Sequence, residues 1–200
     1  MILLTAFEPF GGSGVNASLE AATLLAADPR VRLSVLPVTR GEAQAAALRA
    51  LCRLHDAGTP PRLLLSLGEA GPEPVVRLEK VAVNWDDFRI PDNGGNRHRD
   101  TAIAEGGADA RFATLPVGRI ERDLAGRTPI PVRVSLTAGS FVCNHLSYAV
   151  LEAMATGAVP SCPYLFVHVP NWRPTGDGDD SGLRAIVATV SAVMTQALDG

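Results

Sequence analysis

Short apolar runs alternate along the chain with stretches in which apolar residues recur at helical spacing, as at Leu146, Val150 and Met154. This alternation is typical of βαβ units around a largely parallel sheet. The pattern predicts strands over Ile2–Thr5, Val31–Val38, Leu63–Leu67, Val75–Val83, Val132–Leu136 and Tyr164–Val169. It predicts helices over Ser18–Ala27, Glu42–Asp56, Val117–Leu124, Asn144–Thr156 and Gly182–Ala197.

The chain has 200 residues, a length that suits one domain, and we find neither repeats nor a linker that would divide it. We therefore expect residues 1–200 to form a single three-layer α/β/α sandwich around a twisted, mostly parallel sheet. The longest irregular stretch, Asn84–Gly107, is rich in Asp, Asn, Gly and Arg. Loops of this length inside compact domains are usually functional.

Composition excludes several classes of function. The formal net charge is −3 and basic residues do not cluster, which argues against a nucleic-acid partner. No stretch approaches the ~20 apolar residues of a membrane helix, and the apolar run at the N-terminus is too short for a signal peptide. Three cysteines without metal-type spacing indicate free thiols, so we expect a reducing, cytoplasmic location and no bound metal.

Ligands of such sheets bind beyond the carboxyl ends of the strands. Four loops follow predicted strands or open the helices after them, and we expect them to surround the functional site. They are Ala6–Gly14, Gly68–Pro74, Gly139–Cys143 and Pro170–Asp180.

Cys143 is the sharpest chemical feature of the sequence. It follows a strand and a Thr-Ala-Gly-Ser turn and lies where a helix begins. The positive end of the helix dipole and the unpaired N–H groups there favour a thiolate and can stabilise an oxyanion. The alternative is a small buried apolar residue, the usual role of a free cysteine. That alternative is the better interpretation for Cys52, inside a helix, and for Cys162, between two prolines.

A cysteine nucleophile needs a histidine as its proton acceptor. His145 is two residues from Cys143, about 200° around a helix, and should point away from it. His55 and His98 lie in polar surroundings. His168 lies near the carboxyl end of the strand after the Cys143 helix. It would lie beside the start of that helix if its strand were a parallel neighbour of Val132–Leu136. The alternative is a core histidine whose hydrogen bonds are satisfied, the usual role of a lone histidine on an apolar strand.

A carboxylate should orient this histidine. Glu79 shares a strand face with Val81 and Val83, where an unpaired charge is costly. Its alternative roles are a ladder contact with Arg77 or an exposed edge position. Other acids follow in a polar loop, where acids need no special explanation: Asp86, Asp87 and Asp92.

Thr5–Gly12 contains two of the chain's six phenylalanines, Phe7 and Phe10, in a loop at the expected site. They suggest an apolar pocket, although packing within the loop explains them equally well. The Gly11-Gly12 pair alone is a weak hint of phosphate binding.

Four motifs occur in this order: Thr5–Gly12 with Asn16 and Ser18, Glu79–Asn84, Phe88–Asn93, and Thr137–Leu146, with Val167-His168-Val169-Pro170 after them. Together they resemble the pyroglutamyl peptidase I (pyrrolidone-carboxylate peptidase) family nearly from end to end. The resemblance implies a cysteine exopeptidase that removes N-terminal pyroglutamate through a thioester acyl-enzyme, without a cofactor.

The resemblance also implies the roles of individual residues. It implies a Cys143–His168–Glu79 triad and Arg89 near the oxyanion. It further implies an apolar pocket for the pyrrolidone ring, which by their positions would be formed by Phe7, Phe10, Ile90, Phe141 and Val142, with Asn16 nearby. A homotetramer is implied by the resemblance alone. Rival interpretations are a cysteine hydrolase for another acyl group and a non-catalytic binding module in which Cys143 is structural.

Two departures from the family pattern lie near this site. Ala6-Phe7-Glu8 replaces the usual Gly-Phe-Asp, and Glu69 replaces a glutamine at a pocket position. A glutamate facing a neutral lactam would be costly. We therefore expect the Glu69 backbone to face the ligand while the carboxylate turns toward an arginine, Arg77 or Arg97.

Overall fold

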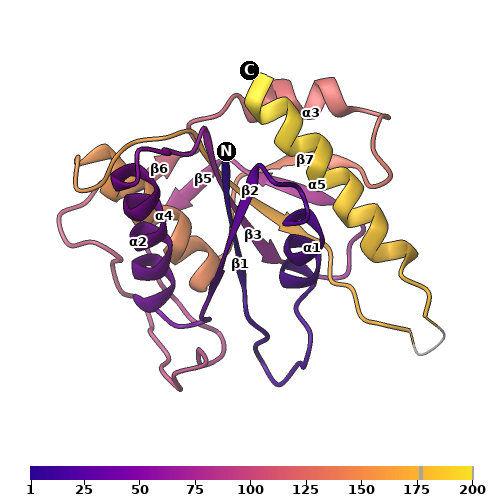
Figure 1. The fold of residues 1–200 in the computed structure, drawn as a ribbon. Helices are drawn as coiled ribbons and strands as arrows, with labels where there is room; N and C mark the ends of the chain where they lie inside the picture. Colours follow the sequence, from indigo (N-terminus) through magenta and orange to yellow (C-terminus); the bar gives the residue numbers. More distant parts are fainter. Residues whose placement is uncertain (176–177, 200) are drawn as a thin grey trace.

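The computed structural model describes residues 1–175 and 178–199, which form a central sheet with helices on both faces (Figure 1). The elements are β1 (Ile2–Phe7), α1 (Ala17–Leu25), β2 (Val31–Leu36), α2 (Glu42–Asp56), β3 (Leu63–Glu69), β4 (Val76–Glu79), β5 (Val81–Val83), β6 (Ala110–Phe112), α3 (Val117–Leu124), β7 (Val132–Ser135), α4 (Val142–Ala155), β8 (Tyr164–Val169) and α5 (Ser181–Asp199). The main sheet has the order β2-β1-β3-β8-β4-β7. The predicted three-layer α/β/α sandwich is confirmed.

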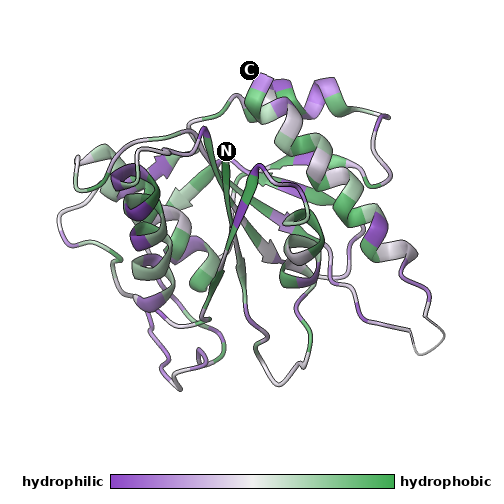
Figure 2. Cartoon of the chain, in the orientation of Figure 1, coloured by the Kyte–Doolittle hydropathy of each residue, from purple (hydrophilic) through white to green (hydrophobic). Residues whose placement is uncertain are grey.

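Neighbouring strand residues point to opposite faces of the sheet and form two separate apolar cores. Leu64 packs with α2 and α4, whereas the next residue, Leu65, packs with α1, α3 and α5. Both residues are fully buried. Helices on both sides therefore explain why the central strands read as continuous apolar runs (Figure 2).

The sheet is not parallel throughout. Strands β2, β1, β3 and β8 pair in parallel, but β4 pairs antiparallel with β8 and parallel with β7. The condition considered for His168, that β8 is a parallel neighbour of β7, is therefore not met, because β4 lies between them. This insertion places Arg77 of β4 opposite His168 of β8, with Glu79 two residues further along β4.

The predicted strand Val75–Val83 is two strands in two sheets. The chain leaves the main sheet at Lys80, whose N–H donates to Ser135 O at 2.8 Å. Strand β5 then pairs antiparallel with β6, which the sequence pattern had not predicted. The face that Glu79 was expected to share with Val81 and Val83 is therefore interrupted.

Helix α5 is long and apolar enough, by length and composition, to cross a membrane, contrary to the expectation that no segment approaches this limit. Its apolar face instead packs in the core formed with α1 and α3, through Leu183, Ile186 and Val190. Figure 1 shows α5 lying across the sheet beside α1. In this fold the apolar face of α5 is buried in that core, while other residues of the helix remain exposed.

Candidate active site

A cleft of about 750 Å³ contains the candidate catalytic residues, and all four predicted loops contribute to its wall. Phe10 comes from the loop after β1, and Glu69 lies where β3 ends. Thr137–Phe141 come from the loop before α4, and Asn171 follows β8. Positions 176 and 177 of the last loop lie outside the described residues.

Cys143 is the second residue of α4 and lies on the cleft, half-buried. The turn before it requires Gly139, whose φ is +78°. Phe141 occupies the N-cap position. Since a phenyl ring cannot accept a hydrogen bond from the first turn, the N–H groups around Cys143 remain available for an oxyanion.

His168 lies at the carboxyl end of β8, 7% exposed, and its Nδ1 lies 2.8 Å from Glu79 Oε1. The carboxylate can only accept, so Nδ1 donates and Nε2 is left for the thiol. The neighbouring strand residue is Gly68. A Cβ there would lie 2.8 Å from the Phe166 ring and 3.0 Å from His168 Cδ2, so only glycine leaves room for the imidazole in this position. The sequence analysis ended this strand at Leu67 and placed Gly68 in the next loop, so it missed this role, whereas β3 extends to Glu69. A glycine inside a buried strand is the signal that could have revealed it.

The surroundings of His168 favour its charged form. Burial alone lowers the pKa of His168, but interactions with Cys143 and Glu79 outweigh it and raise the pKa to about 9. Glu79 is 2% exposed, so its charge acts on His168 with little screening. The arrangement therefore suits an imidazolium between a thiolate and a carboxylate.

The other cysteines and histidines lie away from this arrangement. Burial raises the pKa of the Cys162 thiol to about 11, and Cys52 is inside α2. His145 turns away from Cys143 as predicted, and its Nδ1 lies 2.8 Å from Asp86 Oδ2. His55 is exposed, as expected.

Some expectations about the polar loop were wrong. His98 is half-buried, and its ring packs edge-on against Phe88 at 5.3 Å. Asp86 and Asp92 are 0% and 5% exposed, so these acids are not ordinary loop residues. Asp87 is paired with Arg99 at 2.6 Å. Asp86 is held by Arg40 and His145, which lie outside the loop, and Asp92 accepts from the N–H groups of Arg40 and Asn96. These long-range contacts cannot be read from the polar composition of the loop.

The expected pocket residues line either the cleft or a narrower hollow that shares residues with it. The Phe10 and Phe141 rings lie 6.1 Å apart, and Phe141 packs edge-on against Phe88 at 4.7 Å. Ile90 and the exposed Arg89 line the same cleft. A narrower hollow of about 10 Å³ shares Phe10, Glu69, Phe141 and Cys143 with it and is also lined by Phe7, Asn16, Val38 and Val142.

Asn16 has a clear structural role in addition to its place in this hollow. It is the N-cap of α1, where its Oδ1 accepts from the N–H of Ser18 at 3.0 Å. Its amide nitrogen donates to Glu8 O at 3.0 Å and thereby fastens the loop after β1. The cap explains why α1 begins here.

Glu69 turns its carboxylate toward an arginine, as predicted, but the partner is Arg173. The two side chains form a bidentate pair, with distances of 2.7 Å and 2.9 Å. Glu69 Oε2 also accepts from the N–H of Ala17 at 2.6 Å, at the start of α1. Arg77 and Arg97 were the expected partners, but Arg77 pairs with Glu73 and Arg97 donates to a backbone carbonyl.

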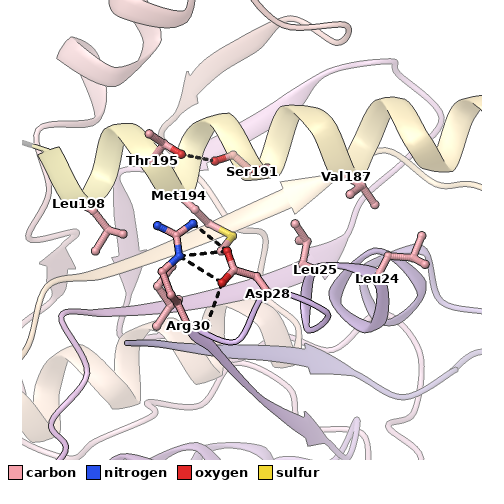
Figure 3. A pocket seen from close by; sticks show the side chains of 10 residues that line it. Leu24, Leu25, Asp28, Arg30, Val187, Ser191, Met194, Thr195 and Leu198 are labelled. Atoms are coloured by element: carbon pink, nitrogen blue, oxygen red, sulfur yellow. Dashed lines mark hydrogen bonds and ion pairs between the residues drawn. The ribbon is translucent and has the colours of Figure 1, made fainter.

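A separate hollow of about 170 Å³ lies between α1 and α5. Figure 3 shows Leu25, Val187 and Met194 around it, with the Asp28–Arg30 ion pair at its edge. It contains neither a cysteine nor a histidine. Its lining offers no cysteine or histidine that could act as a nucleophile or its base, so the Cys143 cleft is the candidate site.

Comparisons with known proteins agree with this geometry. The family model for pyroglutamyl peptidase matches residues 1–195. A pyrrolidone-carboxylate peptidase of Streptomyces coelicolor is 39% identical over 95% of this chain and 91% of its own length. One from Vibrio parahaemolyticus is 37% identical over 99% of this chain and 92% of its own.

Solved structures extend the similarity to the whole fold. The crystal structure of pyroglutamyl peptidase I from Bacillus amyloliquefaciens has a TM-score of 0.84 and 32% identity, covering 100% of this chain and 97% of that one. A mutant pyrrolidone carboxyl peptidase from Pyrococcus furiosus has a TM-score of 0.81 and 30% identity, covering 99% and 98%. The chain therefore belongs to the pyroglutamyl peptidase family, cysteine peptidases that remove N-terminal pyroglutamate.

Proposed function

We propose that Cys143, His168 and Glu79 hydrolyse the amide bond after an N-terminal pyroglutamyl residue by acyl transfer. One observation carries these roles: His168 is buried between a thiol at a helix N-terminus and a carboxylate 2.8 Å from its Nδ1. A nucleophile, a base and an orienting acid are thereby joined in one cleft.

In the first half of the reaction, the Cys143 thiolate attacks the pyroglutamyl carbonyl carbon. Backbone N–H groups at the start of α4, with Arg89, stabilise the oxyanion. His168 donates the Nε2 proton to the leaving amine as the C–N bond breaks, which leaves a thioester on Cys143.

In the second half, neutral His168 takes a proton from water, and the resulting hydroxide attacks the thioester. Collapse of the second tetrahedral intermediate releases pyroglutamic acid and restores the thiolate. Glu79 accepts from Nδ1 throughout and stabilises the imidazolium.

The pocket supports selection of a neutral lactam. Phe10, Phe141 and Ile90 line the cleft together with Cys143, and Phe7 and Val142 line the narrower hollow. A flat, uncharged pyrrolidone ring can pack there, whereas burying the ammonium of an ordinary N-terminus would cost several kcal/mol. The apolar pocket therefore accounts for selection of pyroglutamyl over ordinary N-termini without a carboxylate that binds the substrate. Glu69 is compatible with it because Arg173 neutralises its charge.

Release of a fluorescent amine from a pyroglutamyl amide, compared with prolyl and alanyl amides, tests the proposed substrate. We expect cleavage of the pyroglutamyl amide alone. Equal cleavage of all three would favour a general cysteine hydrolase. No cleavage together with a Cys143 thiol inert to iodoacetamide would favour a binding module.

We also propose that the protein acts in the cytoplasm as a homotetramer. The free cysteines and the family resemblance support these two points. Light scattering of the purified protein, which gives the mass of the assembly in solution, tests the tetramer.

A further inference from the structure

A second histidine–carboxylate pair lies behind the turn that carries Cys143, and the proposed reaction does not use it. His145 is 2% exposed and Asp86 is fully buried. A buried carboxylate needs donors to offset its desolvation, so the contacts that hold this pair are informative.

His145 connects three segments of the chain. Its Nδ1 donates to Asp86 Oδ2 at 2.8 Å, and its Nε2 contacts Gln44 Oε1 on α2. Arg40 Nε donates to the same Asp86 oxygen at 2.7 Å. Helix α4, helix α2 and the loop after β5 therefore meet at one imidazole.

Asp86 begins the part of that loop that forms a wall of the cleft. Its backbone is bridged to Thr101 in both directions, with N···O distances of 2.8 Å and 3.1 Å. The next residue, Asp87, exchanges hydrogen bonds with Ser140 at 3.1 Å and 2.8 Å. Asp87, Arg89 and Ile90 then line the cleft. We call Asp87–Ile90 the cleft wall.

The start of α4, which carries Cys143, is held by contacts that do not involve the His145 side chain. His145 N–H donates to Phe141 O within the first turn of α4, whatever the His145 side chain. The Asn144 amide clamps the same turn to Val83, with distances of 2.9 Å and 3.0 Å. Loss of the His145 imidazole therefore removes a donor from Asp86 and leaves the helix start in place.

We propose that His145 is a positioning residue that acts through Asp86 to hold the cleft wall in register with Cys143. This inference rests on the catalytic role proposed for Cys143. A displacement of about 1 Å at the substrate is enough to reduce turnover by about 10²-fold. The wall carries Arg89 and Ile90, so its displacement affects both binding and the oxyanion.

The test compares three substitutions at one position. His145→Leu removes both polar contacts, His145→Asn keeps a donor near the position of Nδ1, and His145→Gln keeps one near Nε2. His55→Leu makes the same chemical change at an exposed site and serves as the matched control. Each purified variant is measured for kcat and KM on a pyroglutamyl amide, for the rate of Cys143 alkylation by iodoacetamide, and for thermal unfolding.

We expect kcat/KM of His145→Leu to fall about 10- to 100-fold, with a raised KM, as for residues that orient a site from behind. Alkylation of Cys143 should stay within about twofold of wild type. His145→Asn should recover most of the loss and His145→Gln should not, because only the former serves Asp86. The control should match wild type in all measurements.

The proposal is overturned if folded His145→Leu keeps wild-type kcat/KM, or if alkylation falls in parallel with turnover, which would place the effect at the nucleophile. If His145→Leu does not fold, the ranking of Asn above Gln decides, and equal values refute the role of Asp86. Failure of the catalytic roles themselves would appear separately, as turnover by Cys143→Ser.

Discussion

Replacing Glu79 by glutamine removes the charge beside His168 while keeping the size of the side chain. Hydrogen bonds to a charged group contribute about 1.5–3 kcal/mol, which corresponds to about one to two pKa units at roughly 1.4 kcal/mol each. The pKa of His168 is about 9 in the intact protein, above its ordinary value of 6.5. Glu79→Gln should therefore lower it by about one to two units.

In the proposed mechanism the active form requires protonated His168, so activity should be lost as pH rises through the folded pKa. The alkaline limb of kcat/KM should lie near pH 9 in wild type and move down by one to two units in Glu79→Gln. Stability should follow the same sign: the contribution of the His168 proton is fully present below pH 6.5 and lost as pH rises toward 9.

The assay is the pH profile of fluorophore release from a pyroglutamyl amide by wild type, Glu79→Gln and His168→Ala. Glu79→Gln should keep measurable turnover, because the carboxylate orients and does not react, whereas His168→Ala should not. An alkaline midpoint that stays in place in Glu79→Gln would refute the electrostatic coupling. A glutamine variant less active than His168→Ala would refute the assignment of Glu79 as the orienting acid.

Three further substitutions test neighbouring parts of the account. Cys143→Ser should keep the fold and thermal transition but lose at least about 10³-fold in kcat, because an alcohol is a much weaker nucleophile at neutral pH; near-normal turnover would contradict this. Glu69→Gln should change kcat/KM by less than about 10-fold, since the side-chain carbonyl of a glutamine can still accept from Arg173. The acid limb of the pH profile of kcat/KM should remain, and its loss would show that the carboxylate titrates in the pocket. Gly68→Ala should reduce kcat with little change in KM, because its Cβ would clash with the Phe166 ring and crowd the His168 ring; a wild-type kcat would show that the two rings can shift without affecting His168.

Local sequence patterns predicted most helices and strands, but they did not predict how the strands pair in the sheets. Among the described residues, apolar periodicity identified the positions of seven of the eight strands. It merged β4 and β5, because the chain leaves the main sheet at Lys80 without a glycine or proline to mark the break. It missed β6, a three-residue strand with little pattern of its own. The antiparallel insertion of β4 beside β8 follows from long-range packing.

The sequence predicts a candidate site residue where its position depends only on the helix or strand that carries it. The helix start at Cys143 and the end of the strand at His168 are visible in the sequence. Contacts between distant residues are not. Arg173 meets Glu69 across 104 positions, and His145 meets Asp86 across 59, so neither partner could be chosen from spacing.

Detection of the acyl-enzyme tests the central claim most directly. A pyroglutamyl ester, whose leaving group departs faster than an amine, would be mixed with wild-type protein and quenched in acid, and the digested protein would be analysed by mass spectrometry. The account predicts one pyroglutamyl group per chain, attached to the peptide containing Cys143 and absent from Cys143→Ser. Turnover without any adduct on that peptide, or with an adduct on Cys52 or Cys162 instead, would contradict it.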